Sequence, residues 1–230
     1  MRTRYFALAL LVSAAFVPPA AAHHPGADLD KVMGSKERYF QTIDKPAPPF
    51  GLVDTGAKAV ALSDYSEKVV ILHFVYARCP DICPLHTTKL AEIQRTIDRT
   101  PMKDRVRFIG ITTDPANDTP DLLKAYGFSR GLDPENAALL TTRSGQGEGA
   151  TRTLAEAYGH KFVESGEGYQ THSIVTHIID RNGRWAANFH GLKFEPVNMV
   201  LYVNGLLNNA HSPGKKPEPG WWEKIERLFD

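Results

Sequence analysis

The chain has 230 residues, of which 42% are hydrophobic, and a formal net charge of +1. This size and composition suit one globular domain with extensions, and a nearly neutral chain gives no electrostatic basis for binding nucleic acid or acidic lipid. The chain contains only two cysteines, Cys79 and Cys83, so it is not a disulfide-stapled scaffold.

Residues 1–22 have the three-part pattern of a secretory signal peptide. Two arginines lie near the start, an apolar run follows over residues 5–17, and an Ala-x-Ala site ends at Ala22. The run is shorter than the roughly 20 residues that a membrane span needs, and an uncleaved membrane anchor is the alternative. Cleavage after Ala22 predicts a periplasmic protein, in a compartment where disulfides persist.

Strands and helices are predicted to alternate through the body of the chain. Residues 23–45 are polar, with scattered Pro and Gly, and indicate a linker or N-terminal arm. After it come predicted strands at 69–76, 105–111, 138–141, 172–180 and 185–189, and predicted helices at 84–98, 119–126, 151–158 and 196–207. This order predicts a single α/β domain over residues 46–207, with a mixed sheet and helices on both faces.

Residues 208–230 predict a Pro-, Gly- and Lys-rich linker followed by a short amphipathic helix. The apolar side of that helix would hold Trp221, Trp222, Ile225, Leu228 and Phe229. Roughly ten residues do not form a stable helix alone. The segment is expected to dock on its own domain, with a partner or a membrane surface as the alternative.

Both cysteines fall at the junction between the first long strand and the helix that follows. Residues 69–76 are a continuous β-branched and aromatic run, typical of a strand buried on both faces. Pro84 suits the first helical position, so Cys83 is the expected cap residue and Cys79 lies in the loop before it. Such a junction favours a reactive site, and a helix N-terminus stabilises a thiolate.

The cysteine pair is compatible with a structural disulfide, a redox pair or part of a metal site. A loop closed across three residues constrains the unfolded chain little, which argues against a stabilising disulfide. Thiol–disulfide exchange enzymes mostly have two residues between their cysteines. Three residues widen the gap between the sulfurs and can suit a metal, but the spacing alone does not decide between redox chemistry and metal binding.

A third ligand has to come from the nine histidines. His73 is expected to be buried within its strand, and His86 to point to solvent from the first part of its helix. His172 differs because it opens a strand after the loop 165–171, which in a thioredoxin-like sheet faces the junction that carries the cysteines. His172 is therefore the candidate third ligand.

Two carboxylates at the same edge of the sheet are weaker candidates. Asp114 follows the strand 105–111, where a turn-forming role before Pro115 is expected ahead of a contact with the site or with a partner. Asp118 or Thr119 is expected to cap the helix that begins at Pro120.

Three segments together resemble the Sco/SenC family. They are Cys79-Pro-Asp-Ile-Cys-Pro84, Thr113-Asp-Pro-Ala-Asn-Asp-Thr-Pro120 and His172-Ser-Ile-Val-Thr-His-Ile-Ile-Asp-Arg-Asn-Gly183, in the family's order and spacing within residues 45–207. The resemblance implies a thioredoxin-like fold and a mononuclear copper site formed by Cys79, Cys83 and His172. It also implies delivery of copper to the binuclear CuA centre of cytochrome c oxidase.

This chain departs from the family pattern at two positions. The family often has Asp before the ligand histidine, where this chain has Thr171, and an aromatic residue where it has His177. Without that carboxylate, the affinity for the metal or the surface offered to a partner is in doubt, because groups that contact a ligand tune the metal.

The donor atoms fit the same expectation. Two thiolates and an imidazole are soft ligands that suit Cu(I) and can also hold Cu(II), and the thiols must be reduced and deprotonated to bind. We therefore expect a metallochaperone that exchanges copper with subunit II of cytochrome c oxidase or another copper acceptor, and that depends on a periplasmic thiol reductant. A thiol–disulfide reductase that uses Cys79 and Cys83, or a peroxide-removing enzyme of the same fold, is the alternative.

Overall fold

The computed structural model describes residues 25–164, 170–171 and 173–208. In chain order these residues form α1 (Pro25–Lys36), β1 (Phe40–Pro46), β2 (Gly51–Asp54), β3 (Ala59–Ala61), β4 (Val69–Val75), α2 (Ile82–Asp98), β5 (Val106–Thr112), α3 (Pro120–Ser129), β6 (Ala137–Thr141), α4 (Ala150–Ala157), β7 (Val163–Glu164), β8 (Gln170–Thr171), β9 (Val175–Ile179), β10 (Arg184–His190) and α5 (Pro196–Leu207). The predicted signal peptide, His172 and the predicted C-terminal helix lie outside the described residues.

One mixed sheet organises the described residues, with the strand order β1-β10-β9-β4-β5-β6-β2-β3. The central strand β4 is buried at every position. It pairs in parallel with β5 and antiparallel with β9, and β5 pairs in parallel with β6. Because β4 is covered on both faces, its sequence is a continuous apolar run instead of an alternating one. The predicted mixed sheet and its central strand are confirmed.

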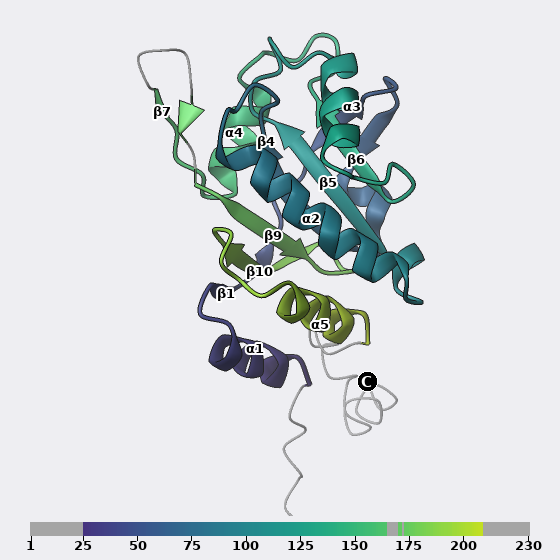
Figure 1. The fold of residues 1–230 in the computed structure, drawn as a ribbon, viewed down its shortest axis with the longest axis vertical. Helices are drawn as coiled ribbons and strands as arrows, with labels where there is room; N and C mark the ends of the chain where they lie inside the picture. Colours follow the sequence, from purple (N-terminus) through teal and green to yellow (C-terminus); the bar gives the residue numbers. More distant parts are fainter. Residues whose placement is uncertain (1–24, 165–169, 172, 209–230) are drawn as a thin grey trace, which may run out of the picture.

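Helices cover both faces of this sheet (Figure 1). On one face α2, α3 and α5 pack around a core that includes Ile71 and Phe108. On the other face α4 packs over a second core that includes Leu72 and Phe74. Successive residues of a strand point to opposite faces, so β4 supplies side chains to both cores. The predicted α/β architecture with two covered faces is therefore confirmed.

The segment predicted as a linker or N-terminal arm contains α1 and β1. Strand β1 pairs with β10 at the edge of the sheet, from Phe40 opposite Phe189 onward. The buried Glu37 carboxylate accepts hydrogen bonds from the Glu195 N–H and the Asn198 amide at the start of α5. Most of the β1 side chains are exposed because the strand lies at the edge, and this is why its sequence lacks an apolar pattern.

Two short pairs of strands are further differences from the prediction. β2 and β3 form an antiparallel pair that extends the sheet beyond β6, although residues 51–61 carry no predicted element. β8 pairs with β7, so the last two residues of the predicted loop 165–171 are in a strand. Among the described residues, none of the helices has the length and apolar character needed to span a membrane.

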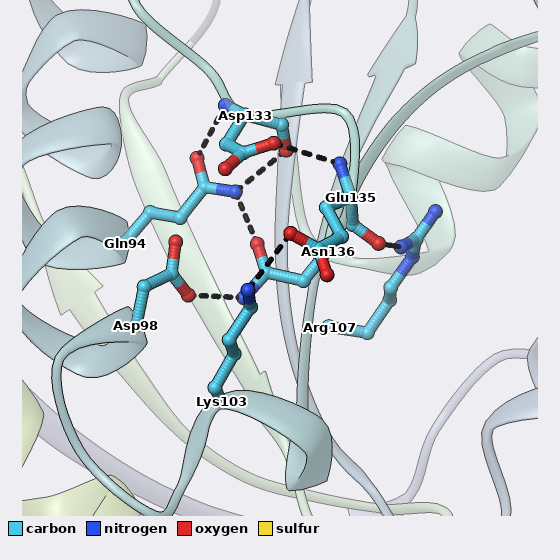
Figure 2. Close-up of polar contacts among 7 residues, drawn as sticks. All are labelled: Gln94, Asp98, Lys103, Arg107, Asp133, Glu135 and Asn136. Carbon is cyan, nitrogen blue, oxygen red and sulfur yellow. Dashed lines mark hydrogen bonds and ion pairs between the residues drawn. The ribbon is translucent and has the colours of Figure 1, made fainter.

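A polar network fixes the loop before β6 to α2, at the end of that helix farther from the cysteines (Figure 2). The fully buried Gln94 amide donates to the Asp133 carbonyl at 2.8 Å and accepts from the Asp133 N–H at 3.0 Å. Asn136 donates to Asp98, and Lys103 pairs with Glu135 at 2.8 Å. These polar groups are hydrogen-bond partners of one another, and they hold the start of β6 in register with β5. The network therefore has a structural role.

Gly110 in β5 occupies a place with no room for a side chain. A Cβ there would overlap Leu139 Cδ2 and approach His73 Cε1 to 3.0 Å, and Leu139 is also packed against Gly127. We expect Gly110→Ala to lower the free energy of unfolding by about 1–3 kcal/mol, the usual effect of overpacking a core. Urea unfolding of the purified variant measures this change.

Gly51→Ala provides the matched control, because a Cβ at Gly51 would have no atom of the described residues within 4 Å. Its stability should stay within about 0.5 kcal/mol of the parent protein. If Gly110→Ala were as stable as Gly51→Ala, the close packing of β4, β5 and β6 described here would be contradicted.

Candidate metal centre

Cys79 and Cys83 lie where β4 leads into α2, as predicted. The predicted cap at Cys83 is wrong, because α2 begins at Ile82 with Asp81 as its N-cap. Pro84 is therefore the third helical residue. It is tolerated there because the first N–H groups of a helix have no partner within the helix. Cys83 consequently belongs to the first turn of α2, and Cys79 to the loop before it.

The two cysteines are not joined by a disulfide, and they lie beside each other. Both cysteines are free, and the Cys83 N–H donates to Cys79 Sγ at 3.4 Å. The Cys83 thiol also donates a hydrogen bond to the Cys79 sulfur. Cys79 is 7% exposed and Cys83 is 2% exposed, so Cys79 is the sulfur nearer to solvent.

The surroundings give the two thiols opposite acidities. Burial acts to raise the pKa of Cys79, but hydrogen bonds from the Cys83 thiol, from the N–H groups of Asp81 and Cys83 and from Tyr76 outweigh it and lower this pKa below its ordinary value. Burial and the hydrogen bond to Cys79 raise the pKa of Cys83 well above its ordinary range. The pair therefore has one thiol that ionises readily and one that holds its proton.

This difference predicts selective alkylation of Cys79. A lowered pKa means that the iodoacetamide reaction of Cys79 levels off below the pH at which a free thiol, with a pKa of about 8.5, does so. The reaction of Cys83 should still be increasing above that pH. Tandem mass spectrometry of the peptide that contains both residues measures the two rates, and equal rates at every pH would contradict the asymmetry.

Asp118 contacts the cysteine loop and does not cap α3. The cap is Thr119, whose side chain accepts a hydrogen bond from the Leu122 N–H. The Asp118 side chain is fully buried, and its Oδ2 accepts from the Ala77 N–H at 3.0 Å and from the Thr112 hydroxyl at 2.5 Å. The sequence does not indicate this contact, because Ala77 and Asp118 are 41 residues apart and no local pattern relates them.

Asp114 joins the same two loops at the surface. The chain turns here as predicted, but the Asp114 backbone carbonyl makes the turn by accepting from the Asn117 N–H at 3.1 Å, while Asp114 Oδ1 accepts from the Asn117 side chain at 2.8 Å. Its Oδ2 pairs with Arg78 at 2.8 Å, which places it against the cysteine loop. The Thr113 N–H adds a backbone hydrogen bond to the Val75 carbonyl at 2.8 Å. The segment that follows β5 therefore holds the cysteine loop at several points.

The histidines divide between one confirmed and one wrong prediction. His73 is buried within β4, as predicted. His86 was predicted to face solvent, but it is 1% exposed, and its Nε2 forms a 2.8 Å hydrogen bond with the Thr176 hydroxyl of β9. The sequence does not show that this side of α2 lies against β9. The contact ties the helix that carries Cys83 to a strand that starts close to position 172.

His172 itself lies outside the described residues. Within the part of the chain that the structure describes, no group of three or more His, Cys, Asp and Glu side chains could hold a metal ion. The structure thus brings together the two predicted sulfur ligands, and the third ligand stays a prediction.

His160 and His177 form a hydrogen-bonded pair on the face of the sheet that α4 covers, opposite the face with the cysteines. The Nε2 atoms of His160 and His177 are 2.9 Å apart in a hydrogen bond, and His177 Nδ1 contacts Asn188 Oδ1 at 2.8 Å. Burial and the neighbouring His160 lower the pKa of His177 well below its ordinary value. Both His177 nitrogens have hydrogen-bond partners within the buried interior, so this pair is part of the core.

The fold and the site together define a class of protein. A mixed sheet covered on both faces, with two free thiols in contact where its central strand leads into a helix, is a thioredoxin-like domain with a paired-cysteine site. The SCO1/SenC family profile matches residues 41–207. The chain belongs to the Sco/SenC family, which confirms the resemblance inferred from the three motifs.

Several relatives agree with this assignment. A SCO2-like protein of Rickettsia prowazekii is 30% identical over 169 residues, covering 70% of this chain and 77% of the relative. ScoI of Bradyrhizobium japonicum, solved with copper bound, is 28% identical with a TM-score of 0.58, over 70% of this chain and 99% of that one. A SCO1/SenC family lipoprotein from Bacillus anthracis has the same fold, with 21% identity and a TM-score of 0.65 over 72% of this chain and 97% of that one. BsSco, another structural neighbour, is a member of the Sco family of cytochrome c oxidase assembly proteins.

Proposed function

We propose that this protein is a periplasmic metallochaperone that carries copper on Cys79, Cys83 and His172 and delivers it to the CuA centre of cytochrome c oxidase. The observation that carries the proposal is the pair of free thiols in contact at the end of β4. Membership of the Sco/SenC family and the copper bound to Bradyrhizobium japonicum ScoI support copper as the metal carried.

The donor set suits a cargo that must be bound and then released. Thiolate and imidazole ligands favour copper, and the sulfurs bind it after their protons leave. Cys79 ionises readily and is the sulfur nearer to solvent, whereas Cys83 is buried more deeply. We infer that Cys79 contacts incoming copper first, and that a partner's ligands displace it first when copper leaves.

The pairing of β4 with β9 supports His172 as the third ligand. The two strands are antiparallel, with pairs from Val70 opposite Ile179 to His73 opposite Thr176. The start of β9 at Val175 therefore lies beside the end of β4 that leads into the cysteine loop. Because His172 comes three residues before β9 in the sequence, this arrangement supports it as the candidate third ligand.

The location and partners complete the proposal. The signal-peptide pattern of residues 1–22 supports export to the periplasm. There the partners would be subunit II of cytochrome c oxidase or another copper acceptor, and a thiol reductant that keeps Cys79 and Cys83 from forming a disulfide.

Direct transfer of copper tests the proposal. Copper-loaded full-length protein is mixed with the copper-free, reduced CuA domain of subunit II, and the visible bands of the CuA centre are followed. The protein is loaded with Cu(I), and ferricyanide then removes one electron from each filled centre, because the visible bands belong to the mixed-valence state. We expect the bands to appear while the protein loses copper, with two loaded molecules used for each binuclear centre. Retention of copper by the protein, with the acceptor left empty, would contradict delivery.

The unequal acidity of the two thiols favours a second candidate function, a thiol–disulfide reductase that acts without obligatory copper. The Cys79 thiolate would attack a partner disulfide and release one partner thiol. Cys83 would then lose its proton and attack the mixed disulfide, leaving the partner reduced and a Cys79–Cys83 disulfide, with two electrons transferred. With an oxidised CuA domain as acceptor, reduction of its disulfide without transfer of copper would favour this candidate.

A further inference from the structure

The cysteine loop is held by a side chain from another element. The Ala77 N–H, two residues before Cys79, donates to Asp118 Oδ2 at 3.0 Å. The same oxygen accepts from the Thr112 hydroxyl at the end of β5. Asp118 therefore links the end of the neighbouring strand to the loop that carries Cys79.

The burial of the Asp118 carboxylate indicates that this link has a functional role. Its side chain is fully buried, and its second oxygen, Oδ1, has no hydrogen-bond partner among the residues that the structure describes. A buried carboxylate oxygen without a partner lowers stability, and groups of this kind in native proteins call for an explanation. Capping of α3 is not the explanation, because Thr119 provides the cap.

This anchor holds the loop that carries one of the two sulfurs. Cys83 is part of α2, so its position is set by the packing of that helix against the sheet. Cys79 is in the loop, and its Sγ lies 3.4 Å from the Cys83 N–H. The place of the loop relative to the helix decides whether the two sulfurs meet, and the Ala77 contact fixes the loop just before Cys79.

We propose that Asp118 is the positioning residue of the cysteine pair, because its buried carboxylate holds Ala77 and thereby keeps Cys79 Sγ beside Cys83. The proposal deepens the proposed function, and only its copper readout rests on that function. A second readout, the thiol–disulfide equilibrium of the cysteine pair, depends on the sulfur geometry alone.

Comparing Asp118→Ala with Asp118→Asn separates positioning from charge. Both variants remove the negative charge, but the Asn carbonyl still accepts from Ala77 and Thr112, and its amide group takes the place of the unpartnered oxygen. In a chelator competition assay we expect Asp118→Ala to raise the copper dissociation constant by about 10–100-fold relative to Asp118→Asn, as losing a contact behind a metal ligand does. Asp121→Ala removes an exposed carboxylate from the first turn of α3 and should match the parent protein.

The second readout is equilibration with glutathione. Oxidised glutathione takes two electrons from the dithiol, which gives the Cys79–Cys83 disulfide and two reduced glutathione molecules. A loop that is no longer held brings the sulfurs together less often, so Asp118→Ala should form the disulfide about tenfold less readily than Asp118→Asn, a rise of about 30 mV in reduction potential. If the parent protein bound no copper, the proposed function would fail, and this measurement would still test the role of Asp118.

Equal behaviour of Asp118→Ala and Asp118→Asn in the glutathione equilibrium would overturn the proposal. If Asp118→Ala does not fold, Thr112→Val and Thr112→Ser replace it, because Val removes the hydroxyl that donates to Asp118 and Ser keeps it. Thr112→Val should then form the disulfide about threefold less readily than Thr112→Ser, a smaller shift of the same sign. Equal equilibria for these two variants would likewise overturn the proposal.

Discussion

Replacing His172 with alanine is expected to weaken copper binding by more than about 100-fold, because losing a ligand costs more affinity than the 10–100-fold that losing an outer contact costs. Two thiolates alone leave copper with an open position that water or buffer fills poorly. The variant should still cycle between dithiol and disulfide, because Cys79 and Cys83 contact each other without help from residue 172. Titration against a copper chelator of known affinity measures the change.

A second histidine variant controls for general loss of imidazole. His190 is partly exposed in β10, and its Nε2 contacts Gln41, so His190→Ala should bind copper as the parent protein does. Parent-like affinity in His172→Ala would remove residue 172 from the site and favour the reductase function, which needs the two sulfurs only.

Oxidation of the cysteine pair is expected to abolish copper binding. A Cys79–Cys83 disulfide has no thiolate to offer, and the metal needs deprotonated sulfur. The reduced protein should bind about one copper per chain and the oxidised protein about none, because a single imidazole does not hold the metal tightly. Metal analysis after desalting, with free thiols counted in the same sample, measures both states.

The same measurement tests whether the oxidation state of Cys79 and Cys83 regulates copper uptake. If copper loading requires reduced sulfurs, the proposed thiol reductant would control when the protein can take up copper. Equal copper content in the reduced and oxidised samples would show that the metal is bound elsewhere on the chain, and the proposed dependence on a reductant would be withdrawn.

The centre of the fold was predictable from the sequence because its local patterns are strong. The apolar run of β4 reflects burial on both faces, and Thr119 followed by Pro120 marks the start of α3. The start of α2 was misplaced by two residues, because Pro is tolerated throughout the first turn and does not mark one position within it. Strand β1 was missed because an edge strand with exposed side chains carries no apolar signal.

The two cysteines of the candidate site could be predicted from the sequence, but the side chains that contact the cysteine loop and its helix could not. The spacing of Cys79 and Cys83 beside a helix start is a local feature, and in the structure the Cys83 N–H donates to Cys79 Sγ at 3.4 Å. The contact of Asp118 with Ala77 and that of His86 with Thr176 join residues 41 and 90 positions apart. Such contacts depend on how strands and helices pack, so no local pattern reveals them. The opposite pKa shifts of the two cysteines follow from the same packing.

X-ray absorption of the Cu(I)-loaded, full-length protein tests most directly whether Cys79, Cys83 and His172 share one metal ion. The spectrum should fit two sulfur ligands and one imidazole nitrogen, and the imidazole contribution should vanish in His172→Ala while both sulfurs remain. A parent spectrum with sulfur ligands and no imidazole, or one that is identical in His172→Ala, would contradict the three-ligand copper site.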